Sequence, residues 1–309
     1  MDSFIIAVKT VSPLFVVIGI GTLFSRTRIC TPQWIDILNK YALYIGFPAL
    51  VIASLLSLEP GEHSFDKLIL YTSGYTVSCM LLAFPVARFF RFSRSMLRTL
   101  FLILPFGNIA YLGIPVLKNA LGDEILPTAA ILSAIYLFWL LTLGIILIEA
   151  LGEDRIHPKK LILSLIQNPL LISVFVGIAI VFFKIKLPSV AEKTILLFSD
   201  SVTAVVLFAL GIFLGTQKIG KPGEWSLVLI LVFVTMLVLP FSYYVFLKAA
   251  NFDELFTRAS ILDAAMPMGL TPYVLASQYK LETSLTARVV VLGTFLSVFI
   301  LPLWITVLK

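Results

Sequence analysis

Charged residues are scarce in this chain. Lys, Arg, Asp and Glu together make up 13% of its 309 residues, whereas hydrophobic residues make up 60% and the mean hydropathy is +1.04. A soluble domain of this length needs far more polar surface to cover its core, so the composition excludes a soluble protein. The net charge of +6 fits short connections between membrane helices rather than a nucleic-acid surface. We expect an integral membrane protein.

Cysteine and histidine are almost absent. Cys30 and Cys79 are too few and too far apart for a disulfide framework or a metal site. His63 and His157 lie in connections and lack the HExxH spacing of a zinc enzyme. No GxSxG motif and no redox cysteine pair occurs, so the sequence predicts neither an enzyme nor a cofactor.

Long apolar runs fill most of the chain. About 20 apolar residues cross a hydrocarbon core of about 30 Å, so these runs predict an all-α protein with ten membrane-spanning helices. The first run lacks a basic leading segment and a cleavage signal, which indicates a retained helix rather than a signal peptide. We expect spans near 5–24, 35–58, 67–90, 97–120, 125–150, 162–183, 190–216, 225–248, 254–279 and 284–308.

Lys and Arg are divided unequally between the two alternating sets of connections. The set that includes "RFFRFSRSMLR" and "GEDRIHPKK" holds most of them. Cytoplasmic connections carry the excess of Lys and Arg in membrane proteins, so this set is expected on the cytoplasmic side. We therefore expect a multi-pass protein of the cell membrane with both termini on the non-cytoplasmic side.

Proline and glycine recur at a fixed distance along the chain. Pro13 and Pro169 are 169 − 13 = 156 residues apart, and Gly113 and Gly269 are 269 − 113 = 156 apart. Five spans in each half would bring the second copy into the membrane from the opposite side, as in an inverted repeat. Chance alignment of two common loop residues is the alternative. We expect a first repeat over 1–150, a short cytoplasmic connection over 151–160 and a second repeat over 161–309.

The fourth and ninth spans carry helix-breaking residues near their middles. They read "LPFGNIAYLGIPVL" and "DAAMPMGLTPYVL", in corresponding positions of the two halves. Broken backbone at membrane depth is tolerated only inside protein or beside a water-filled cavity, and half-helix ends carry partial charges that suit a bound ion or substrate. The alternative is that the prolines merely kink packed helices. We predict a binding site at Gly107, Asn108, Gly113, Pro115, Pro267, Gly269 and Pro272.

These segments resemble the auxin efflux carrier family. The likeness is carried by "FGNIAYLGIPVLKNALGDE", "QNPLLISVFVGIAI" and "AAMPMGLTPYVLASQYKLE", and it extends over essentially the whole chain to "GTFLSVFILPLWI". It implies two inverted five-helix repeats with crossed, broken helices 4 and 9, as in sodium/proton antiporters and bile acid symporters. It also implies a scaffold of spans 1, 2, 6 and 7 and a mobile transport domain of spans 3–5 and 8–10.

The resemblance assigns roles to two residues at the breaks. Asn108 matches the family's asparagine at the fourth-span crossover, and Pro267 matches the ninth-span proline. Gly107 stands before the asparagine, as in bacterial relatives, where the plant PIN carriers have proline. The long central loop of many PIN carriers is also absent here. Bacterial members are associated with small organic anions such as malate and malonate, so the resemblance implies a carboxylate rather than auxin.

Ionisable and polar residues inside spans are candidate functional groups. Asp263, beside the ninth-span break, could bind sodium, carry a proton or cap freed backbone. Asp200 lies in mid-span and either shares such a role or is buried between helices. Arg288 could bind an anion or reach the headgroups. Ser133 and Tyr136 could line the site or bond neighbouring helices.

A carrier that moves a small organic anion by elevator-type alternating access at the crossover is the function that the sequence favours. A membrane sensor that binds its ligand at the same site is the alternative. "ALGDE" at Asp123 resembles part of the GxGD motif of intramembrane aspartyl proteases, but the first glycine and a partner Tyr-Asp pair are missing. The expected partners are the organic anion, the lipid bilayer and, as an option, a second copy in a homodimer, but no nucleic acid.

The predicted orientation can be tested with single cysteines. In a background without Cys30 and Cys79, Ser64→Cys should react with a membrane-impermeant thiol reagent added to intact cells, and Ser95→Cys should react only after permeabilisation. The reverse pattern would overturn the orientation and the placement of the central connection in the cytoplasm.

Overall fold

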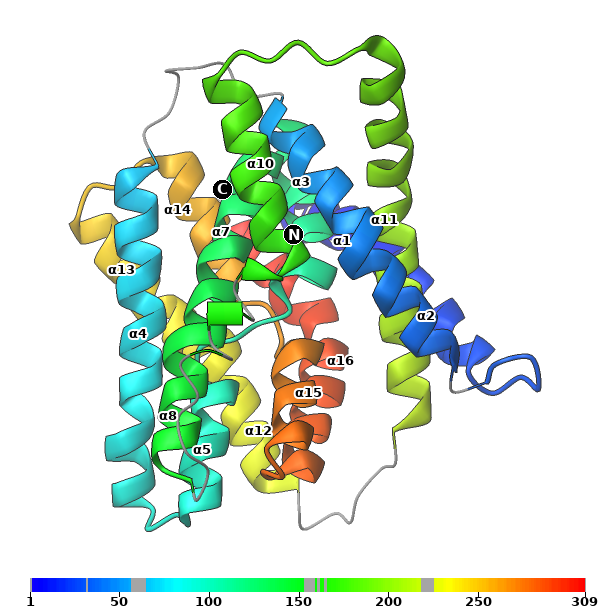
Figure 1. The fold of residues 1–309 in the computed structure, drawn as a ribbon. Helices are drawn as coiled ribbons and strands as arrows, with labels where there is room; N and C mark the ends of the chain where they lie inside the picture. Colours follow the sequence, from blue (N-terminus) through cyan, green and yellow to red (C-terminus); the bar gives the residue numbers. More distant parts are fainter. Residues whose placement is uncertain are drawn as a thin grey trace.

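The computed structural model is helical throughout the part of the chain that it describes (Figure 1). That part comprises residues 2–31, 33–56, 65–152, 159, 162–163, 166–217 and 225–308. Within these residues, 7 helical stretches are long and apolar enough to cross a membrane. The prediction of an all-helical, multi-pass membrane protein is confirmed at this level.

The long stretches coincide with predicted spans to within a few residues. Some of them combine α-helix with a π-helical turn, in which an extra residue is inserted without ending the helix. They are α1 (Asp2–Phe24), α2–η1–α3 (Gln33–Tyr41, Ala42–Gly46, Phe47–Leu56), α4 (Asp66–Phe89), η3–α7–η4–α8 (Asp123–Ile125, Leu126–Trp139, Leu140–Gly144, Ile145–Ala150), α11 (Ser189–Thr216), α12–η6–α13 (Trp225–Phe233, Val234–Val238, Leu239–Ala249) and α16 (Thr283–Val307).

Shorter helices occupy the other three predicted spans. The sixth contains α10 (Pro169–Phe182), which begins where the Asn168 side-chain oxygen accepts hydrogen bonds from the Leu170 and Leu171 N–H groups at 3.0 and 3.2 Å. Asparagine is a favoured N-cap and proline suits the first helical position, so "NP" at 168–169 starts this helix. The fourth and ninth are divided into α5 (Arg94–Ile103), η2 (Ile109–Gly113) and α6 (Ile114–Leu121), and into α14 (Glu254–Ala264) and α15 (Leu270–Gln278).

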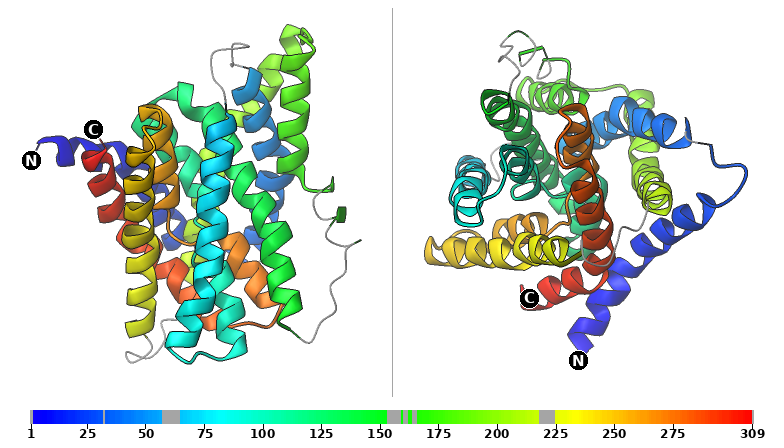
Figure 2. Two further views of the ribbon diagram at one scale, coloured as in Figure 1. Left: turned by 90° about the vertical axis from the view of Figure 1, so that its left-hand side faces the viewer. Right: turned by 90° about the horizontal axis from the view of Figure 1, so that it is seen from below.

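The helices gather in two groups. In the first group, α1 packs along α11, α10 packs along α3, and α3 also contacts α11. In the second group, α4 contacts α5 and α7, and α13 contacts α14 while α12 contacts α16. Seen from below, α1 and α11 lie on one side of the molecule, and α4 and α12 lie on the other (Figure 2). The second group contains α5 and α14, which are the first halves of the two broken spans.

Two helical hairpins share one local structure. Arg91 after α4 and Asn251 after α13 both have positive φ, 54° and 48°, and in each case the next residue donates to the carbonyl five residues back. Ser93 and Asp253 then cap the following helices with their side chains. The spacing is the same, because 251 − 91 = 160 and 253 − 93 = 160. The two hairpins lie at opposite ends of the molecule (Figure 1).

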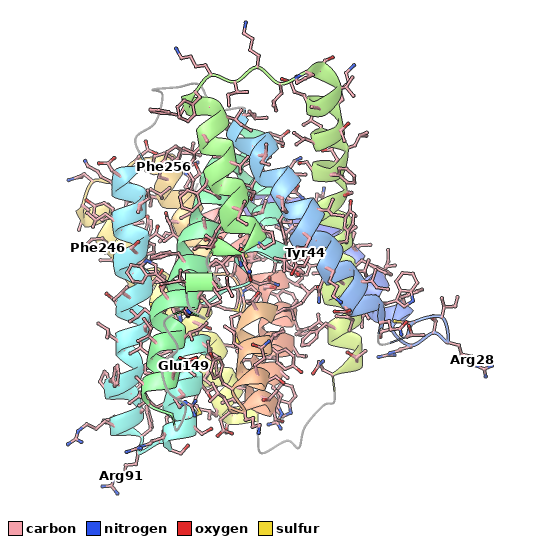
Figure 3. All side chains as sticks on the ribbon, in the orientation of Figure 1. Arg28, Tyr44, Arg91, Glu149, Phe246 and Phe256 are labelled. Carbon is pink, nitrogen blue, oxygen red and sulfur yellow. The ribbon has the colours of Figure 1, made fainter. Side chains whose placement is uncertain are left out.

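The two ends of the molecule can be recognised from labelled side chains. Arg91 lies at one end and Phe256 lies near the other (Figure 3). Arg91 belongs to the basic connection that is predicted to be cytoplasmic. Ser64 lies outside the described residues, and Ser95 donates a hydrogen bond to Glu282 Oε1 at 2.8 Å. Because Arg91 is exposed, Arg91→Cys is the clearer cytoplasmic position for the labelling test.

Glycine allows α1 and α11 to pack unusually closely. Gly21 and Gly211 face each other, so a Cβ built on Gly211 would collide with the Ile18 carbonyl oxygen and lie 2.9 Å from the Gly21 Cα. The Thr22 hydroxyl donates to the Gly211 carbonyl at 3.0 Å across the same contact. Small residues and hydroxyl groups hold membrane helices together in this way. The contact fixes α1 firmly against α11.

Gly211→Ala should therefore destabilise the protein. Forcing a methyl group into a packed backbone contact costs about 1–3 kcal/mol, which should lower the midpoint of thermal unfolding in detergent. Gly19→Ala, also in α1, is the matched control because a Cβ there meets nothing within 4 Å. Equal unfolding midpoints for the two variants would contradict this account of the α1–α11 contact.

Candidate functional site

Both broken spans lose helical structure at the predicted residues. The first break follows Ile103, where α5 ends, and the chain becomes helical again at Ile109. The second break follows Ala264 and ends at Leu270. Proline removes a backbone donor and glycine weakens a helix, so "LPFGN" and "MPMG" end α5 and α14 here. The breaks are interruptions, not kinks.

The two breaks cross and pair through their backbones. Gly107 and Met268 form an isolated antiparallel bridge. The Asn108 N–H donates to the Pro267 carbonyl at 2.6 Å, and the Gly269 N–H donates to the Phe106 carbonyl at 3.4 Å. A Cβ on Gly269 would lie 2.9 Å from the Gly107 carbonyl oxygen, so the close approach requires glycine. Each break thus satisfies part of the other's exposed backbone.

Asn108 lies at the centre of this crossing. Its backbone carbonyl accepts from the Leu112 and Gly113 N–H groups at 3.1 and 2.9 Å, which starts the helical turn of η2. Its side chain is 3% exposed, and its Nδ2 has no hydrogen-bond partner among the described residues. Buried amides are nearly always hydrogen-bonded, so an unpaired donor here indicates a position for a ligand or water.

Asp263 is the buried carboxyl group of the site. It is 1% exposed, and within the described part of the chain neither Oδ1 nor Oδ2 has a hydrogen-bond partner. A Cβ built on Gly113 would lie 2.9 Å from Asp263 Oδ1, so the carboxyl group lies against the backbone of the first break. Asp263 therefore belongs to the ninth span but contacts the fourth.

Hydroxyl groups from three helices lie near Asp263. Ser260 lies one turn earlier in α14 and is 1% exposed. Tyr136 of α7 and Tyr243 of α13 both lie within electrostatic range of the Asp263 carboxyl group. The Tyr136 and Ser260 hydroxyls make no hydrogen bond of good geometry in the described structure, although Thr76 lies near the first and Tyr243 lies near the second. The Tyr243 hydroxyl lies 3.3 Å from Thr72 Oγ1. The site is a cluster of buried, largely unpaired polar groups.

The comparison with known families decides what kind of protein carries this crossing. A model of the family described as "Membrane transport protein" matches residues 6–305, nearly the whole chain. The chain belongs to the membrane transport protein family. The resemblance to auxin efflux carriers inferred from the motifs is confirmed, and the family is one of membrane transporters rather than enzymes.

Relatives of this family member come from archaea, bacteria and plants. An uncharacterized transporter of Methanocaldococcus jannaschii is 22% identical, with 94% of this chain and 95% of the relative covered. A protein named "Putative malonate transporter" from Rhizobium meliloti is 24% identical, with 93% of this chain and 91% of the relative covered. Auxin efflux carrier component 8 of Arabidopsis thaliana is 23% identical, with 94% of each chain covered. The likeness therefore spans whole chains.

The crossing brings most of the predicted site residues of this transporter-family chain together. Gly107, Asn108, Pro267 and Gly269 form the backbone pairing, and Gly113 contacts Asp263. Pro115 and Pro272 are buried in the half-helices that follow the breaks, α6 and α15. Ser133 and Tyr136 are buried on α7, and both hydroxyls are unpaired within the described structure.

Two predicted candidates do not join the cluster. Asp200 is exposed on α11, so the expectation that it is buried between helices is wrong. Arg288 is half-buried near the start of α16 and donates to the Ser284 hydroxyl at 2.8 Å, which fits a side chain that reaches the membrane interface. Asp123 is also outside the site: its side chain is 77% exposed and lies 3.4 Å from Lys118 Nζ. That position does not suit a catalytic aspartate inside the membrane.

Sequence reasoning missed three residues of interest. Ser260 and Tyr243 face the Asp263 region, but a serine and a tyrosine inside an apolar run are too common to single out. Glu149 is 3% exposed and accepts a hydrogen bond from the Tyr279 hydroxyl at 2.8 Å. It lies in the half of the molecule that carries Arg91 (Figure 3). Glu149 could have been found from the sequence, because it is a charged residue inside the predicted fifth span.

Gly113→Ala should disable the site while leaving the protein folded. The added methyl group would lie 2.9 Å from Asp263 Oδ1 and would displace the carboxyl group. We expect at least a tenfold loss of substrate-dependent activity at unchanged abundance in the membrane. Gly144→Ala is the matched control in another π-helical turn, η4, because a Cβ there would lie no closer than 3.5 Å to any neighbour. Full activity of Gly113→Ala would show that the contact with Asp263 has no role.

Proposed function

We propose that this protein is a secondary transporter that carries a small organic anion, a carboxylate, across the cell membrane by elevator-type alternating access. The observation that carries the proposal is the crossing itself, which leaves the Asn108 amide and the Asp263 carboxyl group buried and unpaired among the described residues. Unpaired polar groups at this depth indicate a binding site for a polar ligand.

The crossing offers two kinds of group to an anion. The half-helices that begin at Ile109 and Leu270 direct their N-termini into the crossing, and the first N–H groups of a helix carry partial positive charge. The Asn108 Nδ2 adds a side-chain donor beside the first of them. A carboxylate can accept several such hydrogen bonds at once, which favours it over a neutral or cationic substrate.

Asp263 is our candidate for the group that binds a coupling cation. No Lys, Arg or His among the described residues faces its carboxyl group, and its neighbours are the Tyr136, Ser260 and Tyr243 hydroxyls. A fully buried carboxylate is stable only when a cation, a proton or several donors compensate its charge. Hydroxyl oxygens near the carboxyl group suit a proton or sodium, and the substitution described below separates the two.

The arrangement of helices supports a scaffold and a mobile domain. The predicted scaffold spans 1, 2, 6 and 7 correspond to α1, α2–α3, α10 and α11, which pack on one another. The α4–α5 and α13–α14 hairpins share the same turn and cap and lie at opposite ends of the molecule (Figure 1). That relation supports two inverted five-helix repeats, in which the crossing would move relative to the scaffold.

Transport in proteoliposomes is the direct test of this function. Reconstituted protein should exchange a labelled mono- or dicarboxylate, such as malonate, across the bilayer with saturation, and Asn108→Ala should abolish most of that exchange. A sensor would bind the same ligand saturably without flux. Saturable binding with no exchange for any bound carboxylate would replace the carrier by the sensor.

Asp263→Asn should separate coupling from exchange. Asparagine keeps the shape of the side chain but cannot release a proton and binds cations weakly. If a proton is coupled, gradient-driven transport should lose its dependence on the pH gradient while substrate exchange survives. If sodium is coupled, the sodium-dependent stabilisation by substrate should weaken instead. Unchanged gradient-driven transport would show that Asp263 does not bind the coupling cation.

A further inference from the structure

An apolar groove of about 1190 Å³ separates the two helix groups on the outside of the molecule. One wall is formed by α3 and α10, and the other is formed by α4 and α7. Neither Asn108 nor Asp263 is among the residues that line the groove, and α7 contacts both α3 and α10. It is a site distinct from the cluster at Asp263.

Exposed apolar side chains line much of the groove. Its lining includes Ile69, Phe138 and Phe175, which are 46%, 43% and 72% exposed and point away from the protein core. In a membrane-spanning protein such side chains face lipid. A small hydrated carboxylate would lose its water in this groove without gaining donors, so the transported anion is not its ligand. The volume also exceeds the range of about 300–1000 Å³ that suits small molecules.

Lys184 places one charge at an end of this groove. It follows α10 directly, is exposed, and is the one charged residue among the described residues that line the groove. None of the ion pairs found within the described chain involves Lys184. A long apolar groove suits the acyl chain of a phospholipid, and the positive charge of a lysine at its end complements an anionic headgroup.

We propose that an anionic phospholipid binds in this groove, with an acyl chain between α10 and the α4–α7 wall and its phosphate at Lys184. The lipid would fill the seam between the two helix groups. Binding of this lipid does not depend on the proposed transport cycle, so it can fail or succeed independently of it.

Native mass spectrometry of the detergent-purified full chain tests the proposal. With phosphatidylglycerol and phosphatidylcholine supplied in equal amounts, the wild-type protein should retain phosphatidylglycerol preferentially. Lys184→Glu should reduce that preference by at least about fivefold, because it removes a lysine that attracts the phosphate and adds a charge that repels it. Lys186→Glu, in the same connection but outside the lining, should retain it.

Substitutions that fill the groove test the acyl chain separately. Ala134→Trp on α7 should remove both lipids, whereas Leu229→Trp, on the exposed face of α12 away from the groove, should not. Ile69→Trp on α4 is the second variant if Ala134→Trp fails to fold. Loss of lipid in the groove variants together with retention in Leu229→Trp supports the site. No retained lipid in the wild-type protein, equal retention in Ala134→Trp and Ile69→Trp, or a dimer that these variants dissociate would overturn it.

Discussion

Backbone polar groups cannot remain unpaired inside a membrane, and the structure of this protein depends on how two interrupted helices meet that requirement. Each unpaired group would cost several kcal/mol in hydrocarbon. Phe106 to Asn108 and Pro267 to Gly269 pair with each other instead, through a short antiparallel bridge. Neither break is satisfied alone, so the fourth and ninth spans must cross at this point. Glycine at Gly107 and Gly269 permits the approach.

The crossing determines where the chemistry can occur. The backbone N–H and carbonyl groups of the two breaks bond to each other and are not available to nearby side chains. The Asn108 Nδ2 and the Asp263 carboxyl oxygens remain without hydrogen-bond partners within the described part of the chain. Asp263 lies against Gly113, so a group on the ninth span is sensitive to the position of the fourth. A ligand that binds one half-helix and a cation that binds the other would therefore influence each other over a short distance.

The fold was largely predictable from the sequence because membrane helices are long, apolar and separated by charge. Span boundaries, the cap at Asn168 and the two breaks all follow from local composition. The pairing of Gly107 with Met268 was not predictable in register, since it joins residues far apart in the chain. The proximity of Tyr243 to Asp263 was hidden for the same reason, because only packing brings this hydroxyl to the carboxyl group. Ser260 lies one helical turn before Asp263 in α14, and its spacing from Asp263 was available from the sequence. Asp200 misled the prediction because its position within a helix does not reveal which face it occupies.

Ligand-induced thermal stabilisation of wild-type protein and Asn108→Ala tests most directly whether the crossing is the binding site. Both proteins would be screened against mono- and dicarboxylates with and without sodium. We expect at least one carboxylate to raise the unfolding temperature of the wild-type protein. This rise should disappear in Asn108→Ala, while the unliganded unfolding temperature of the variant is retained. An equal rise in both proteins would place the anion elsewhere and contradict the central claim.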